Sequence, residues 1–100
     1  MKFIWKWKWN FEDREKETEL YEKIAKGMEE NPDDWPKMLT PTCFTGRGKG
    51  FRLIEADNEE QLMRLVTAWA PTESYSLEPY LEAGEKWSKI IGEVSSRYWS

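Results

Sequence analysis

The stretch Phe3-Ile4-Trp5-Lys6-Trp7-Lys8-Trp9 places an aromatic ring at every second position. A repeat of two is typical of a β-strand, because successive side chains of a strand point to opposite faces of the sheet. The rings therefore share one face, while Ile4, Lys6 and Lys8 share the other. Large rings left in water form an association site. We predict a strand over residues 3–9 and, whichever of its faces meets the helices, a partner on the open face of the sheet.

Helical patterns follow in three places. Residues 12–29 carry apolar side chains three and four positions apart, and this helix should end before Asn31-Pro32, because proline disfavours helical geometry in the residue ahead of it. Asp57 or Asn58 should cap a second helix, which ends before Pro71. A last helix, from about residue 81, has one apolar stripe made by Trp87, Ile90, Ile91, Val94 and Tyr98.

Three further strands are predicted, over residues 37–45, 51–56 and 75–80. Pro41 lies inside the first of them. Since proline cannot donate a hydrogen bond to a neighbouring strand, we expect this strand at a sheet edge or at a bulge. The glycine-rich segment Gly46-Arg47-Gly48-Lys49-Gly50 is expected to be the turn that joins it to the next strand.

The resulting order is βαββαβ followed by a helix. With right-handed crossovers it predicts an α+β fold of the ferredoxin-like type, a four-stranded antiparallel sheet with two helices on one face. Residues 1–80 would form this domain. Residues 81–100 would form a C-terminal amphipathic helix that packs on the same domain or on its dimer partner. A homodimer formed sheet against sheet is the simplest cover for the remaining face.

Composition excludes several classes of protein. The 100 residues, 39% hydrophobic and 34% charged, suit one globular domain. The chain has no histidine, which excludes the catalytic triads and the zinc or haem sites that need imidazole. Its one cysteine, Cys43, excludes an internal disulfide and favours a reducing compartment. No apolar run has the length of a membrane span or a signal peptide. We expect a cytoplasmic protein with no membrane partner, no metal and no cofactor.

Nucleic-acid binding is considered because RNA-recognition modules share this element order. Their third strand begins with a basic residue, a glycine and an aromatic residue, as Lys49-Gly50-Phe51 does here. Leu53 and Ala56, however, stand where further stacking rings are expected. The net charge of -4 is also unfavourable for binding a phosphate backbone. We therefore expect no nucleic-acid partner.

Several segments resemble the dimeric α+β-barrel superfamily and, within it, a set of short proteins classed only as a domain of unknown function. The resemblance covers most of the chain and is carried by Gly48-Lys49-Gly50-Phe51-Arg52-Leu53-Ile54-Glu55-Ala56-Asp57 with Glu60, Leu62 and Trp69, by Trp7, by the loop at residues 31–36, and by Tyr75-Ser76-Leu77-Glu78-Pro79-Tyr80-Leu81. It implies a ferredoxin-like subunit whose sheet pairs with that of a twin to close a dimeric α/β barrel. It also implies a pocket between sheet and helices. Because the chain has no histidine, the haem-degrading and histidine-based activities of the superfamily are not expected.

The candidate ligand-binding residues are Trp5, Trp7, Trp9, Arg52 and Trp69. Indole rings are flat and each offers one N–H to orient a carbonyl group, so four of them suit a flat aromatic or quinone-like ligand. Arg52, in an apolar strand, could hold a carboxylate through two hydrogen bonds. The alternatives are ordinary core packing for the indoles and an ion pair or solvent contact for the guanidinium. No catalytic residue is predicted.

Three functions follow from these observations. The first is a homodimeric protein of the dimeric α/β-barrel type that binds a small organic molecule in a Trp-rich pocket. The second is a cofactor-independent monooxygenase or isomerase acting on a small aromatic or acidic substrate, with Arg52 stabilising an enolate or phenolate. The third is a structural dimer without a ligand.

Overall fold

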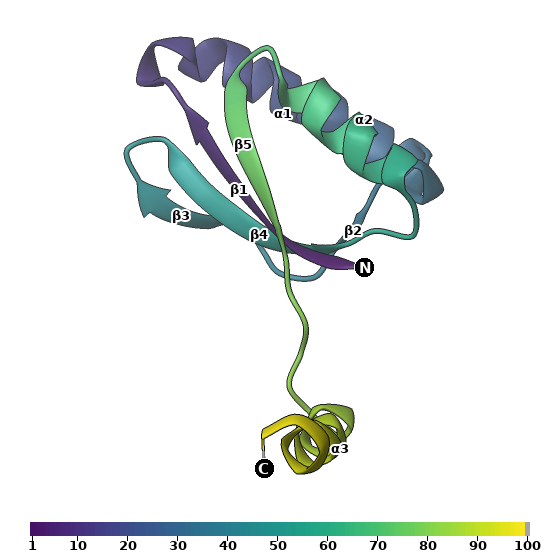
Figure 1. Ribbon diagram of the computed structural model, residues 1–100. Helices are drawn as coiled ribbons and strands as arrows, with labels where there is room; N and C mark the ends of the chain where they lie inside the picture. The colour runs from purple at the N-terminus through teal and green to yellow at the C-terminus, as the bar shows by residue number, and fades with distance from the viewer. Residues whose placement is uncertain (100) are drawn as a thin grey trace.

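The aromatic stretch forms β1 (Lys2–Trp9), which lies inside the sheet (Figure 1). Its neighbours, both antiparallel, are β4 (Lys49–Glu55) and β5 (Glu73–Pro79). The computed structural model describes residues 1–99 and confirms an α+β fold with an antiparallel sheet.

The sheet has five strands, so the prediction of four was wrong. The strand expected over residues 37–45 is divided into β2 (Lys37–Met38) and β3 (Cys43–Gly46), and both pair with β4. The gap contains Pro41, which has no N–H for the ladder. Beside it, the hydroxyl of Thr40 accepts a hydrogen bond of 3.0 Å from the backbone N–H of Leu53. A side chain thus replaces the backbone acceptor where the ladder is interrupted.

Two helices lie on the same side of the sheet (Figure 1). Helix α1 (Arg14–Glu30) follows a short turn, η1 (Phe11–Asp13), and is followed by another, η2 (Pro32–Asp34). Helix α2 is Glu59–Trp69. The cap is Asn58 rather than Asp57, since its side chain accepts a hydrogen bond of 2.9 Å from the backbone N–H of Gln61. In turn, the side-chain oxygen of Gln61 accepts a hydrogen bond of 2.7 Å from the backbone N–H of Asp57. The side chains of Asn58 and Gln61 together fix the start of the helix.

The aromatic face of β1 is the one that meets the helices. Trp5 and Trp7 are buried, whereas Lys6 and Lys8 between and after them are exposed. The indoles pack in a core with Ile24 of α1, Ile54 of β4, and Leu65 of α2, the last two being 0% exposed. Burial of one such aliphatic side chain contributes roughly 1.5–3 kcal/mol. The core therefore fixes which face of the sheet stays open.

A third helix stands apart from this body. An extended segment after β5 leads to α3 (Glu85–Val94) and a π-helical turn, η3 (Ser95–Trp99). In Figure 1 this arm extends away from the sheet and from α1 and α2. Its apolar side chains are exposed, among them Trp87 at 48% and Ile90 at 50%. Among residues 1–99, no helix has the length and apolarity needed to cross a membrane.

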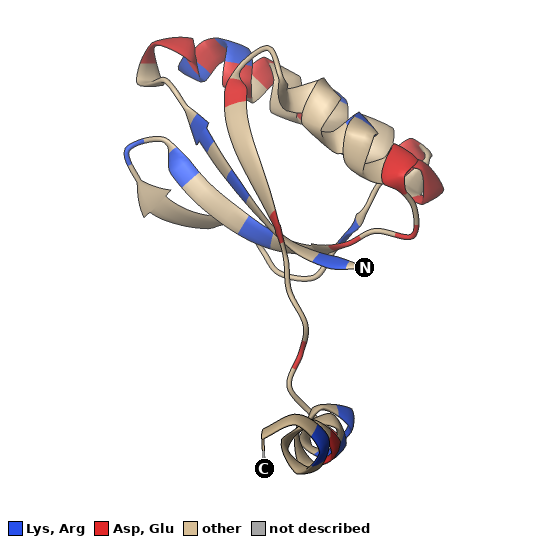
Figure 2. Cartoon of the chain, in the orientation of Figure 1, with Lys and Arg blue, Asp and Glu red and all other residues tan. Residues whose placement is uncertain are grey.

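Charge is divided between the layers (Figure 2). Basic side chains recur along β1 and β4, and acidic side chains gather in the first turns of α1 and α2. Acids at those positions are favourable, because the first turn of a helix carries partial positive charge.

Candidate functional site

A cavity of about 370 Å³ lies between the helix-facing side of the sheet and α1. Six aromatic side chains line it: Trp5, Trp7, Trp9, Tyr21, Phe44 and Trp69. Its volume is within the range of small-molecule sites, which are mostly apolar with a few polar groups. The cavity therefore has the size and lining of a ligand pocket.

The rings of the cavity touch one another in tilted pairs. The centroids of Trp5 and Trp7 are 4.7 Å apart with an angle of 49° between the planes. Trp69, from the end of α2, lies 6.5 Å from Trp5 and 6.4 Å from Tyr21 of α1. Such offset arrangements are the favourable ones for aromatic pairs, so the ring walls are held in place by their own contacts.

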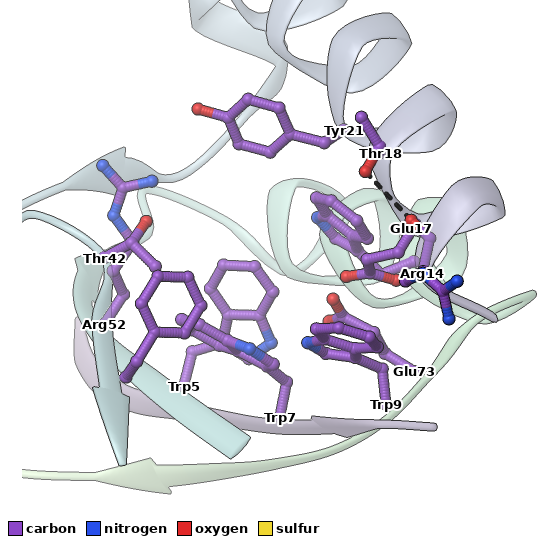
Figure 3. A pocket seen from close by; sticks show the side chains of 12 residues that line it. Trp5, Trp7, Trp9, Arg14, Glu17, Thr18, Tyr21, Thr42, Arg52 and Glu73 are labelled. Atoms are coloured by element: carbon purple, nitrogen blue, oxygen red, sulfur yellow. Dashed lines mark hydrogen bonds between the residues drawn. The ribbon is translucent and has the colours of Figure 1, made fainter. Parts of the chain in front are cut away.

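All five residues selected from the sequence as ligand-binding line this cavity, namely Trp5, Trp7, Trp9, Arg52 and Trp69. Trp5 and Arg52 are directly opposite in the pairing of β1 with β4, which places both on the helix-facing side. The Nε of Arg52 donates to the carbonyl oxygen of Thr40 at 2.9 Å. This bond fixes the guanidinium group at one side of the cavity (Figure 3). That these residues bind a ligand remains a prediction.

Two indole N–H groups in the cavity wall are left without a partner. Trp5 and Trp69 are 5% and 8% exposed, and the Nε1 of each is buried with no hydrogen bond to any of residues 1–99. A buried donor without an acceptor costs about 1–3 kcal/mol. An acceptor oxygen that reached either N–H group would remove that cost.

Two carboxyl groups face each other in the same cavity (Figure 3). Glu17 extends from α1, and Glu73 is the first residue of β5, opposite Trp9 in the pairing with β1. The two groups are close enough for a side-chain hydrogen bond with Glu17 to be one cause of the raised pKa of Glu73. Neither forms an ion pair with any Lys or Arg of the described chain.

One shared proton accounts for this contact. The Oε2 of Glu17 and the Oε1 of Glu73 are both buried, and no donor group within residues 1–99 reaches either oxygen. Two ionised carboxylates would only repel, whereas a protonated carboxyl group can donate to a carboxylate. Burial, the hydrogen bond that protonated Glu73 donates to Glu17, and the charge of Glu17 raise the pKa of Glu73 to about 10. At neutral pH the pair therefore holds one proton and carries a single negative charge.

Sequence reasoning missed this carboxyl pair, although a signal was present. Glu17 continues the apolar stripe of α1, three to four residues before Leu20 and Tyr21. Glu73 has the same parity along β5 as Leu77, which packs against the core. An acid at an apolar position of an amphipathic element is a candidate for a buried functional group.

Other chemistry was sought among the described residues. Within residues 1–99, no three His, Cys, Asp or Glu side chains converge as a metal site requires. The Sγ of Cys43 donates to the carbonyl oxygen of Pro41 at 3.4 Å and does not line the aromatic cavity.

The fold and the cavity define a small α+β protein with an aromatic pocket between its sheet and its first helix. The chain belongs to the family described as a domain of unknown function, DUF3303, whose family model matches residues 1–94. This confirms the resemblance to a domain of unknown function that the sequence indicated. No curated protein and no solved structure matches the chain.

Proposed function

We propose that this protein binds a small, flat organic molecule in the aromatic cavity and does so as a homodimer. The observation that carries the proposal is the pair of buried indole N–H groups, of Trp5 and Trp69, that line the cavity without a partner. Core packing alone explains the rings but not two unsatisfied donors in residues that line a cavity. A carbonyl or other acceptor oxygen of a bound molecule satisfies them.

The rest of the cavity supports the same class of ligand. Flat aromatic molecules gain dispersion contacts from indole faces. Arg52 adds a positive charge at one side of the cavity (Figure 3) and suits an anionic or strongly electron-rich oxygen. An aromatic compound that bears oxygen substituents fits both features.

Tryptophan fluorescence tests this proposal directly. Oxygen-bearing aromatic compounds should quench the emission saturably, because the indoles of the cavity are in contact with the ligand. Thr42→Phe, on the cavity wall, should narrow the space and weaken binding, whereas Thr45→Phe, exposed on β3 and outside the cavity, should not. Linear quenching without saturation across the panel would leave a structural dimer as the better proposal.

The open face of the sheet supports a second copy of this chain as the partner. The register of β1 and β4 pairs Ile4 with Leu53 and Lys6 with Phe51. The half-buried side chains of Ile4, Phe51 and Leu53 are therefore neighbours on the side of the sheet away from the helices. Counting β2 and β3 as one interrupted strand, the order β2-β4-β1-β5 supports the proposal of a ferredoxin-like sheet. Two such sheets packed face to face would make the dimeric α/β barrel that the resemblance implies.

A charge on that face tests the dimer. Leu53→Glu should shift the native mass from dimer to monomer at micromolar concentration, because two carboxylates would be buried against each other across the axis. Ser76→Glu adds the same charge to the same face on the outer strand β5 and should have a smaller effect. A monomeric mass for the unaltered protein would exclude the dimer.

A cofactor-independent oxygenase or isomerase is the second candidate. It is favoured by Arg52, which lines the cavity together with the indoles and could stabilise an enolate or phenolate. An enzyme would convert the compound that quenches the fluorescence, and Arg52→Met would lower the rate more than the affinity. A binding protein would release the compound unchanged.

A further inference from the structure

The carboxyl pair is the most polar feature of an otherwise aromatic cavity. Glu17 and Glu73 come from different elements, meet inside the cavity, and are separated from every lysine and arginine of residues 1–99 by more than ion-pair distance. Placing two acids together costs stability, since each charge opposes the other. A second, independent observation also points to a ligand. Trp5 lines the same cavity and is only 5% exposed, and its Nε1 has no hydrogen-bond partner among residues 1–99.

We propose that the Glu17–Glu73 pair is the polar subsite that selects the ligand, and that it selects aromatic compounds with a hydroxyl group and a carbonyl group. The hydroxyl would donate to the carboxylate of the pair, and the carbonyl would accept from an indole N–H. This inference rests on the proposed function and adds the chemical class of the ligand.

The charges in the cavity indicate whether the group that binds the carboxyl pair is a neutral hydrogen-bond donor or a cation. The pair, with its shared proton, carries one negative charge. Arg14 from α1 and Arg52 from β4 also line the cavity, and Tyr21 is the remaining titratable group there. The two arginines oppose entry of an organic cation. A neutral hydroxyl group takes the hydrogen bond to the carboxylate without adding charge, and bonds to a charged acceptor are among the stronger ones.

The test uses two coumarins of nearly equal size. Both 7-hydroxycoumarin and 7-methylcoumarin carry a ring carbonyl, but only the first has a hydroxyl group to donate. Binding is followed by quenching of tryptophan emission. We expect the hydroxyl compound to bind roughly ten- to a hundredfold more tightly. Equal affinity of the two compounds would overturn the proposal while leaving the aromatic cavity as a binding site.

Variants of the two glutamates then assign the preference to the pair. Glu73→Gln keeps the carboxylate of Glu17, and the glutamine amide can donate to it as the protonated carboxyl group of Glu73 does. The preference for 7-hydroxycoumarin should therefore persist in this variant. The double variant Glu17→Leu with Glu73→Leu has no acceptor oxygen at either position and should bind both coumarins equally. Glu22→Gln, an exposed position on the same helix, is the matched control.

The outcomes separate the two proposals. A preference that survives in the double variant would overturn the role of the pair, because another group would then accept the hydroxyl. Failure of both coumarins to bind saturably would overturn the subsite and the proposed function together. The comparison of the two compounds on the unaltered protein needs no variant, so the test stands even if the double variant does not fold.

Discussion

At the scale of single residues, Gly50 shows how closely the indoles are packed. It lies on β4 directly opposite Trp7 of β1. A Cβ at this position would come within 2.5 Å of the Trp7 ring and 2.7 Å of the carbonyl oxygen of Cys43. Neither atom can move away easily, because the ring lies in the core and the carbonyl belongs to the neighbouring strand. The glycine therefore allows a large ring to lie flat on the sheet.

Gly50→Ala should lower the free energy of unfolding by about 1–3 kcal/mol, the range for overpacking a close-packed site. Urea denaturation followed by tryptophan fluorescence measures the change. Gly92→Ala is the control, since nothing lies within 4 Å of a Cβ there, and within the last turn of helix α3 it should stabilise slightly. Equal stability of Gly50→Ala and the unaltered protein would mean that the Trp7 ring is free to move.

The carboxyl pair makes stability depend on pH in a defined direction. The pKa of Glu73 is raised from 4.5 to about 10 by burial and by Glu17. Between these values the unfolded chain has released a proton that the folded chain still binds. Stability contributed by the protonated pair is therefore complete below the lower value, falls as pH rises through this window, and does not fall further above the upper value.

Glu73→Gln should flatten this dependence, because an amide does not titrate. Near pH 8 we expect the variant to be more stable by on the order of 1 kcal/mol, a value reduced for the solvent that screens a half-buried carboxyl group. That corresponds to a rise in Tm of about 4–8 °C. Thermal unfolding from pH 5 to pH 9 measures it. Glu22→Gln should keep the unaltered profile, and an unchanged profile in Glu73→Gln would argue against a shared proton.

At the scale of elements, the start of α2 gives a local prediction. Asn58 accepts the N–H of Gln61, whereas the side chain of Asp57 makes no such contact, although the sequence allowed either residue as the cap. Asn58→Ala should lower the free energy of unfolding by about 0.5–2 kcal/mol. Asp57→Ala should have little effect, and a larger loss from Asp57→Ala than from Asn58→Ala would reverse the assignment.

Elements were predictable from the sequence where one pattern decided them. The alternation in β1 and the helical spacing of α1 and α2 were sufficient, because each pattern has a single period and a clear end signal. Pro41 was identified as a disturbance, but whether it bends a strand or divides it depends on the substitute acceptor. That acceptor, the hydroxyl of Thr40, meets Leu53, thirteen residues away, and local patterns do not contain such a contact.

Only part of the candidate site was predictable from the sequence, since Tyr21 and Phe44 of the cavity wall were not selected. Four tryptophans and an arginine could be selected because such residues are rare and their positions share strand or helix faces. The carboxyl pair joins residues 56 positions apart, 17 and 73, in a chain with 19 acidic residues. Only the fold brings these two residues to one cavity, and acids of solvated helix faces look the same in the sequence.

At the scale of the whole molecule, the arm formed by α3 and η3 is the part that the fold of one chain leaves uncovered. Trp87, Ile90 and Ile91 are 48%, 50% and 38% exposed, and they share one side of the helix. The extended segment before it is held to the sheet by an ion pair of 2.6 Å between Lys2 and Glu82. The arm is thus attached at its base while its apolar side meets no other part of residues 1–99.

We expect this apolar side to pack on the second copy of the chain and to add to the dimer. Replacing Ile90 and Ile91 together by serine should raise the dimer dissociation constant at least about tenfold, because the loss of two aliphatic contacts exceeds 1.4 kcal/mol. Replacing Lys86 and Lys89 by serine alters the polar side of the same helix and should leave the constant within about threefold. Sedimentation equilibrium measures the dimer dissociation constant of both double variants. If the isoleucine variant dimerises as tightly as the lysine variant, the arm covers its own domain instead. The isoleucine variant should then unfold at a lower temperature both as a monomer and as a dimer.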